Sequence, residues 1–170
     1  SMPEAPEVDL SAYMQDDNYG RSVEDVYNDI LFHGIELRGI KKILSCSSSG
    51  MTARVSSAPA PAQWIKNHLR SRWIADPLVL DCAFQMATVW CYEETGNVSL
   101  PSYCASYRQY CSAFPAEGVT AVLAVTDLTD HKMTGNFLLV DKENRLAAKM
   151  TGYEAVLDAS LYKAFKPHLH

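Results

Sequence analysis

The sequence predicts an α+β fold in which a curved antiparallel sheet wraps around one long central helix. Two observations lead to this prediction. Residues 77–95 form an apolar segment of helical length with very little charge. A helix that is hydrophobic nearly all round has to be enclosed by other elements rather than lie on a surface. Segments with strand-like alternation occur before and after it, and an antiparallel sheet can curl around such a helix.

The central helix has clear start and stop signals. Asp76 is a good N-cap residue, and Pro77 suits the first helical position, where its missing N–H is not needed. Residues 78–90 are apolar apart from Asp81, Gln85 and one threonine. Gly96 follows as the residue that closes the helix.

The sheet is expected to contain six strands. A Ser-Ser-Ser-Gly turn joins the first two into a hairpin, and residues 141–144 form the turn between the last two. The expected strands are residues 35–48, 51–57, 106–114, 119–128, 134–140 and 146–157. A short helical turn is expected at 63–69, after a Pro-containing break in the pattern.

A chain of 170 residues is expected to form one domain with a sizeable core. Residues 1–24 are acidic and without periodicity, so they are expected to be a linker or an extended arm. The domain itself is expected at 25–165, followed by a tail at 166–170. A long helix inside a curved antiparallel sheet is the hot-dog fold, and the prediction is a single hot dog.

Composition argues against several classes of function. The net charge is -5 and there is no basic stripe, so we expect no nucleic-acid partner. The longest apolar run is too short to span a bilayer and no signal-like segment opens the chain, so we expect a cytoplasmic protein without membrane association. Its five cysteines have neither CxxC nor zinc spacing, so we expect reduced thiols and no metal site.

Asp81 is the most informative residue of the central helix. A carboxylate in the middle of a buried helix is costly unless a partner satisfies it. Gln85 lies four residues on, on the same face, and can donate a hydrogen bond to it. A desolvated, partnered carboxylic acid is what an enzyme needs to donate a proton near neutral pH. From the residues alone, a purely structural polar pair is the favoured interpretation.

Five short motifs occur in order along residues 27–165. The segment from Asp76 to Gln85 has the form HPxLLDxxxQ/H, with Asp in place of the first His. An upstream segment has the form YGPxFQGL and reads His33-Gly34-Ile35-Glu36-Leu37-Arg38-Gly39-Ile40. Leu100-Pro101 and Arg108 have the form LPxxxxxxR, and residues 135–141 and 150–154 supply two further strands. Together these motifs resemble the dehydratase domains of polyketide synthases and polyunsaturated fatty acid synthases. The resemblance makes a functional role for Asp81 the favoured interpretation.

The resemblance implies half of a two-part enzyme. Such dehydratases are double hot dogs, in which the N-terminal half supplies a catalytic His from an HxxxGxxxxP motif and the C-terminal half supplies an Asp. This chain resembles the C-terminal half. None of its histidines is followed by Gly and Pro at that spacing; they are His33, His68, His131, His168 and His170. The isolated chain is therefore expected to be inactive or nearly so.

The family reaction implies the substrate and the partner. A 3-hydroxyacyl chain, carried on the phosphopantetheine of an acyl carrier protein, loses water to give an enoyl thioester. The resemblance implies no other cofactor. An acidic carrier protein could dock on Lys66, His68, Arg70 and Arg72, although a solvated basic face is the favoured interpretation of these residues.

The resemblance also implies roles for individual residues. Asp81 is the acid that protonates the departing hydroxyl, and Gln85 is its partner. Substrate-binding residues are expected at four positions, His33, Gly34, Leu37 and Pro101. His33 replaces the Tyr of the upstream motif, and the favoured interpretation is that it only lines the pocket.

Two other functions stay open. One is a non-catalytic hot-dog module that binds acyl chains or organises the synthase, and the other, less favoured, is a stand-alone acyl-thioesterase. A lone hot dog leaves one sheet edge and one helix flank uncovered, and such surfaces tend to pair. We therefore expect pairing with an N-terminal hot dog or with a second copy, as a homodimer.

Overall fold

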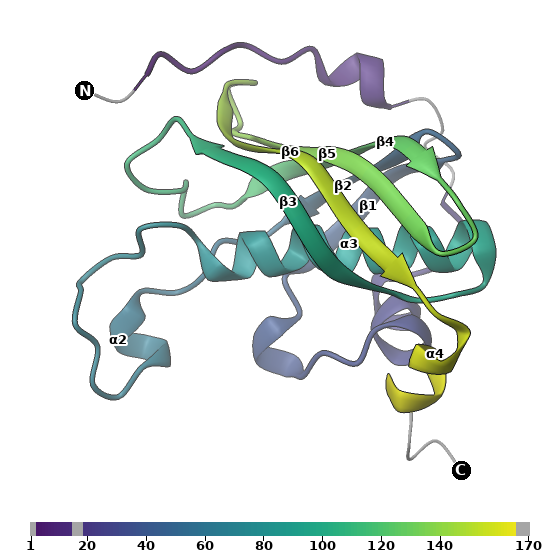
Figure 1. Ribbon diagram of the computed structural model, residues 1–170. Helices are drawn as coiled ribbons and strands as arrows, with labels where there is room; N and C mark the ends of the chain where they lie inside the picture. Colours follow the sequence, from purple (N-terminus) through teal and green to yellow (C-terminus); the bar gives the residue numbers. More distant parts are fainter. Residues whose placement is uncertain (1–2, 15–18, 166–170) are drawn as a thin grey trace.

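A six-stranded antiparallel sheet curves around one long helix in the computed structural model of the chain, which describes residues 3–14 and 19–165 (Figure 1). The strands follow the order β1-β2-β4-β5-β6-β3 across the sheet. Their bounds are β1 Ile40–Ser47, β2 Gly50–Val55, β3 Ser99–Gln109, β4 Val119–Leu128, β5 Lys132–Val140 and β6 Leu146–Leu157. This architecture confirms the predicted α+β hot-dog fold.

Helix α3 spans Pro77–Thr95, as predicted. Its N-cap, Asp76, is 4% exposed and accepts hydrogen bonds from the backbone N–H groups of Val79 and Ala58, both at 2.9 Å. Gly96 ends the helix in the left-handed conformation, with φ at 74°, which a glycine adopts without strain. The Asp76 carboxylate thus joins the start of α3 to the chain that leaves β2.

The core lies between α3 and the concave face of the sheet. Strand β5 alternates between core and solvent, and its side chains Met133, Phe137 and Leu139 are fully buried. From the helix side, Trp90 is buried and its indole N–H donates to the carbonyl of Ser47 at 2.8 Å. The enclosure predicted for an all-round apolar helix is therefore confirmed.

Short helical segments connect these elements. They are η1 Leu10–Tyr13, α1 Val23–Asp25, η2 Val26–Ile30, η3 Ile35–Leu37, α2 Pro61–Trp64 and α4 Ala159–Phe165. Among the described residues, none of the helices combines the length and apolar character needed to cross a lipid bilayer.

The N-terminal arm is extended and lies against the sheet (Figure 1, purple). The backbone of Glu7 forms a bridge with Arg145. The carbonyl of Tyr13 accepts hydrogen bonds from the side chains of Ser45 and Thr52, at 2.9 and 3.0 Å. The arm is thus held to the sheet by backbone contacts at both of its described ends.

Four of the expected boundaries were wrong. The first strand begins at Ile40 rather than residue 35, because residues 35–37 form a 3-10 turn. Strand β3 is Ser99–Gln109 rather than 106–114; as an edge strand it is exposed on both faces, so burial imposes no alternation. The helical turn lies at Pro61–Trp64, and Ala159–Phe165 is helical rather than part of a polar tail. The tail at 166–170 lies outside the described residues.

Removing the carboxylate of Asp76 should destabilise the domain. In Asp76→Ala, two buried backbone N–H groups lose their acceptor, and we expect the free energy of unfolding to fall by about 1–3 kcal/mol. Urea denaturation measures this change. Asp76→Asn keeps an acceptor oxygen and should lose clearly less; equal losses for the two variants would contradict the capping role.

Candidate active site

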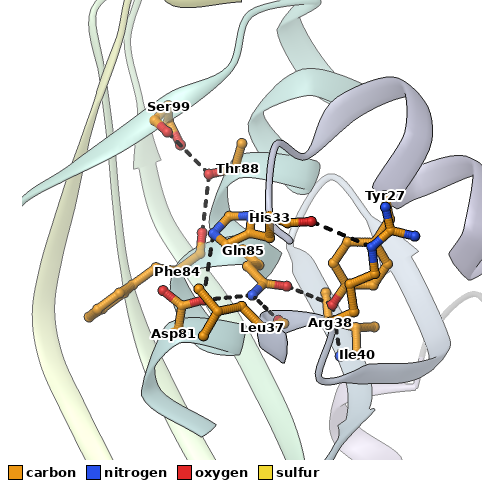
Figure 2. A network of polar contacts seen from close by, with 10 residues as sticks. All are labelled: Tyr27, His33, Leu37, Arg38, Ile40, Asp81, Phe84, Gln85, Thr88 and Ser99. Carbon is orange, nitrogen blue, oxygen red and sulfur yellow. Dashed lines mark hydrogen bonds and ion pairs between the residues drawn. The ribbon is translucent and has the colours of Figure 1, made fainter. Parts of the chain in front are cut away.

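Asp81 and Gln85 lie one turn apart on α3 and contact each other (Figure 2). The side-chain amide of Gln85 donates to Oδ2 of Asp81 at 2.7 Å. Gln85 is 1% exposed, whereas the Asp81 side chain is 31% exposed. The pairing expected from the spacing is therefore present, with the carboxyl group at the edge of the core and its partner inside it.

Three hydrogen bonds determine the orientation of the Gln85 amide. Its Nε2 donates to Asp81 and to the carbonyl of Leu37, at 2.7 and 2.8 Å. Its Oε1 accepts from the hydroxyl of Tyr27 at 2.7 Å, and that hydroxyl accepts from the backbone N–H of Ile40 at 2.9 Å. Figure 2 shows this chain of contacts running from Ile40 to Asp81. Every polar atom of the buried amide thus has a partner.

Tyr27 is the member of this network that sequence reasoning missed. It lies in η2, directly after α1, and is 4% exposed. Ser22 and Asp25 form a capping box at the start of this helical segment. That capping box, followed by apolar residues at helical spacing, is the signal that could have located the element.

The loop from His33 to Ile40 brings the upstream motif onto the helix. Gly39 packs so closely on α3 that an added Cβ would overlap Sγ of Cys82 and the side chain of Leu78. This close approach places the carbonyl of Leu37 against Gln85, so Leu37 joins the network through its backbone. Gly34 is exposed and immediately precedes η3.

His33 lies beside Asp81. Its Nε2 is 3.5 Å from Oδ2 of Asp81, and its side chain is 11% exposed. Burial lowers the pKa of His33, and the neighbouring carboxylate of Asp81 opposes this effect. Arg38 donates to the carbonyl of His33 at 3.4 Å, and its guanidinium lies 5.2 Å from the ring centre of Tyr27. The structure therefore brings together His33, Asp81 and Gln85.

Pro101 lies outside this network. It belongs to edge strand β3, where it pairs with Ala155 of β6. Its role in substrate binding stays a prediction.

Two hollows occur on the side of the loop that precedes α3. A cavity of about 430 Å³ adjoins Leu37 and is lined mainly by Trp64, Ile65, Trp73 and Pro77. A larger one, of about 710 Å³, is lined by residues 69–75 together with Tyr107, Gln109, Cys111 and Ser112. We regard the smaller cavity as the more relevant one, because Leu37 connects it directly to Gln85.

The chain matches one protein family over most of its length. The family model for the polyketide synthase dehydratase N-terminal domain matches residues 5–157. One of the proteins that form the polyunsaturated fatty acid synthase of Thraustochytrium sp. is 36% identical over 72 residues, which are 42% of this chain and 3% of that protein.

Solved dehydratase domains share the fold. A trans-AT polyketide synthase dehydratase from Brevibacillus brevis superposes with a TM-score of 0.72 at 20% identity, covering 93% of this chain and 55% of that one. The dehydratase from the CurK module of curacin polyketide synthase gives 0.71 at 19% identity, covering 91% and 54%. The CurK dehydratase was also solved as two inactive mutants, one with a histidine replaced by phenylalanine and one with an aspartate replaced by asparagine. The chain thus spans about half the length of these domains.

Removing the Tyr27 hydroxyl should destabilise the network. Tyr27→Phe leaves Oε1 of Gln85 and the N–H of Ile40 buried without a partner, and we expect the free energy of unfolding to fall by about 2–3 kcal/mol. Tyr107→Phe removes a hydroxyl that bonds to Gln109 on the exposed strand β3, and should cost less than about 0.5 kcal/mol. Denaturation of both variants measures the difference, and a Tyr27→Phe protein as stable as the control would contradict the network.

Proposed function

This chain belongs to the family of polyketide synthase dehydratase domains, and from this membership we propose that it supplies the acid of a 3-hydroxyacyl thioester dehydratase site. The observation that carries the proposal is the carboxyl group of Asp81. It is set into an otherwise apolar helix, held by a fully bonded amide, and still about one third exposed. A group that served only to fill the core would have no need of an exposed oxygen.

The reaction removes water from the acyl chain. A base takes the proton from the α-carbon, the C–O bond at the β-carbon breaks, and an α,β double bond forms. Asp81 gives its proton to the β-hydroxyl, which leaves as water, and the carboxylate is protonated again before the next turnover. Positioned proton transfer of this kind contributes about 10²–10⁴-fold per group. A site with the acid and without the base is therefore a poor catalyst.

We assign the chain to the C-terminal hot dog of a double hot dog. The matching family model is named for the N-terminal domain, but the acid-bearing motif around Asp81 and the lack of an HxxxGxxxxP motif favour the C-terminal half. The chain also spans about half of the solved domains. In this assignment the base is a histidine of the N-terminal hot dog.

The inactive CurK mutants support a pair of one histidine and one aspartate. In that dehydratase, replacing either residue type gave an inactive protein. In this chain, Asp81 has the position and the hydrogen bonding that an acid of such a pair requires. We therefore assign the acid role to Asp81 and the positioning of its carboxyl group to Gln85.

The substrate is proposed to reach Asp81 past the loop that precedes α3. The cavity beside Leu37 is lined by Trp64, Ile65 and Trp73, which suit an acyl chain. His33, Gly34 and Leu37 would border the reacting end, and Pro101 the far side. Arg70 and Arg72 line the neighbouring hollow, where they suit the phosphate of phosphopantetheine or an acidic carrier protein.

The free edge of the sheet is proposed to pair with a second hot dog. Strand β3 lies at one end of the sheet and is exposed along nearly all of its length (Figure 1). Tyr103 and Tyr107 are 58% and 39% exposed on it. A long, exposed edge strand is a template for pairing with another strand. The partner is the N-terminal hot dog in the synthase, or a second copy when the chain is alone.

Removing the acid should abolish dehydration. In the synthase that contains this chain, Asp81→Asn should lower the rate of enoyl thioester formation from a 3-hydroxyacyl thioester by at least about 100-fold. Asp127→Asn changes an exposed aspartate on β4 and should leave the rate unchanged. If Asp81→Asn keeps the parental rate, the acid assignment is wrong and a binding or scaffolding module becomes the better interpretation.

The isolated chain should dimerise through β3. Sedimentation equilibrium of this chain at tens of micromolar should give a dimer, and Tyr103→Lys should weaken the dimer at least about tenfold, because a lysine on an edge strand opposes pairing. Leu128→Lys, at a similarly exposed position on β4, should have little effect. A monomeric parent chain would contradict this part of the proposal.

A further inference from the structure

The site contains a second titratable side chain, His33, whose role the proposed function leaves open. His33 lies between η2 and η3, and its ring stacks on that of Phe32 with the ring centres 4.4 Å apart. Its Nε2 points to Oδ2 of Asp81 at 3.5 Å (Figure 2). Catalytic contacts are often this long in an unliganded protein and tighten when the substrate binds.

The network determines which oxygen of Asp81 can carry the acidic proton. Oε1 of Gln85 accepts from Tyr27, so the NH₂ end of the amide has to face Asp81. Oδ2 of Asp81 is therefore an acceptor, since a proton on it would meet the N–H of Gln85. From the described part of the chain, no hydrogen bond reaches Oδ1. The proton that Asp81 donates consequently resides on Oδ1.

The same oxygen determines the tautomer of His33. A nitrogen that faces the electron-rich Oδ2 has to carry a hydrogen, so Nε2 is protonated. Nδ1 is buried and has no hydrogen-bond partner among the described residues. A second proton there would place an N–H in the interior without an acceptor, which is costly. His33 is thus a neutral imidazole with an N–H directed at Asp81.

We infer that His33 is a positioning residue that, together with Gln85, holds Oδ2 of Asp81 and leaves Oδ1 to deliver the proton. This inference rests on the proposed function of Asp81. It differs from the pocket-lining role expected for His33 from the sequence, because the contact is with the acid itself rather than only with the substrate.

Other titratable groups face this pair from three elements. Tyr27 approaches from η2, Arg38 from the loop after η3, and Cys82 from α3. Burial raises the pKa of Tyr27 and raises that of Cys82 to about 12, so both stay neutral near pH 7. Arg38 contacts the Tyr27 ring and the His33 carbonyl rather than the imidazole nitrogens. A pH effect in this region therefore originates from His33 and Asp81.

The activity test compares His33→Phe with His33→Gln in the synthase. Phenylalanine keeps a ring that can stack on Phe32 but has no donor, whereas glutamine can place an amide N–H near the position of Nε2. For His33→Phe we expect kcat about tenfold lower with KM nearly unchanged. The alkaline limb of the kcat profile should move up by about one pH unit, because a carboxylate that loses a donor keeps its proton to higher pH. His33→Gln should restore most of both.

The outcomes separate this inference from the proposed function. If Asp81→Asn abolishes dehydration and His33→Phe leaves the pH profile unchanged, His33 does not position the acid and the inference is overturned. If Asp81→Asn has no effect, the proposed function itself fails.

A second measurement needs no activity. In the chain labelled with ¹⁵N-histidine, two-bond ¹H–¹⁵N correlation spectra at pH 7 should show His33 with Nε2 protonated and Nδ1 unprotonated. An Nδ1–H tautomer, or an imidazole protonated on both nitrogens, would overturn the inference even if the Phe variant failed to fold.

Discussion

The amide of Gln85 is the contact on which the arrangement of the site depends. A buried amide is stable only when its donors and its acceptor are all satisfied. Here the three partners come from three parts of the chain: Tyr27 in η2, the carbonyl of Leu37 after the loop motif, and Asp81 on the same helix. Placing all three requires the close packing of Gly39 on α3. The geometry of the carboxyl group is thus tied to the packing of the loop.

The position of Asp81 reconciles a core helix with a reactive group. Helix α3 is buried along most of its length, and a carboxylate within it would be destabilising if it were isolated. The Gln85 amide offsets this cost at Oδ2, while the partial exposure of the side chain leaves the other oxygen accessible. The same division gives stability to one side of the carboxyl group and chemistry to the other.

Local signals account for what the sequence predicted well. Helix α3 was bounded correctly because Asp76, Pro77 and Gly96 act within a few residues of its ends. The pair of Asp81 and Gln85 followed from helical spacing alone. Tyr27 was missed because its contact with Gln85 joins residues 58 positions apart. Strand β3 was misplaced because an edge exposed on both faces leaves no hydrophobic period to read.

The central claim is that Oδ1 of Asp81 protonates the β-hydroxyl of a 3-hydroxyacyl thioester. A crystal structure of the synthase dehydratase region, with a non-hydrolysable 3-hydroxyacyl analogue bound, tests it most directly. We predict the β-hydroxyl within about 2.5–3.0 Å of Oδ1, with Oδ2 still bonded to Gln85. A bound analogue whose hydroxyl contacts Oδ2, or lies out of reach of Asp81, would contradict the account.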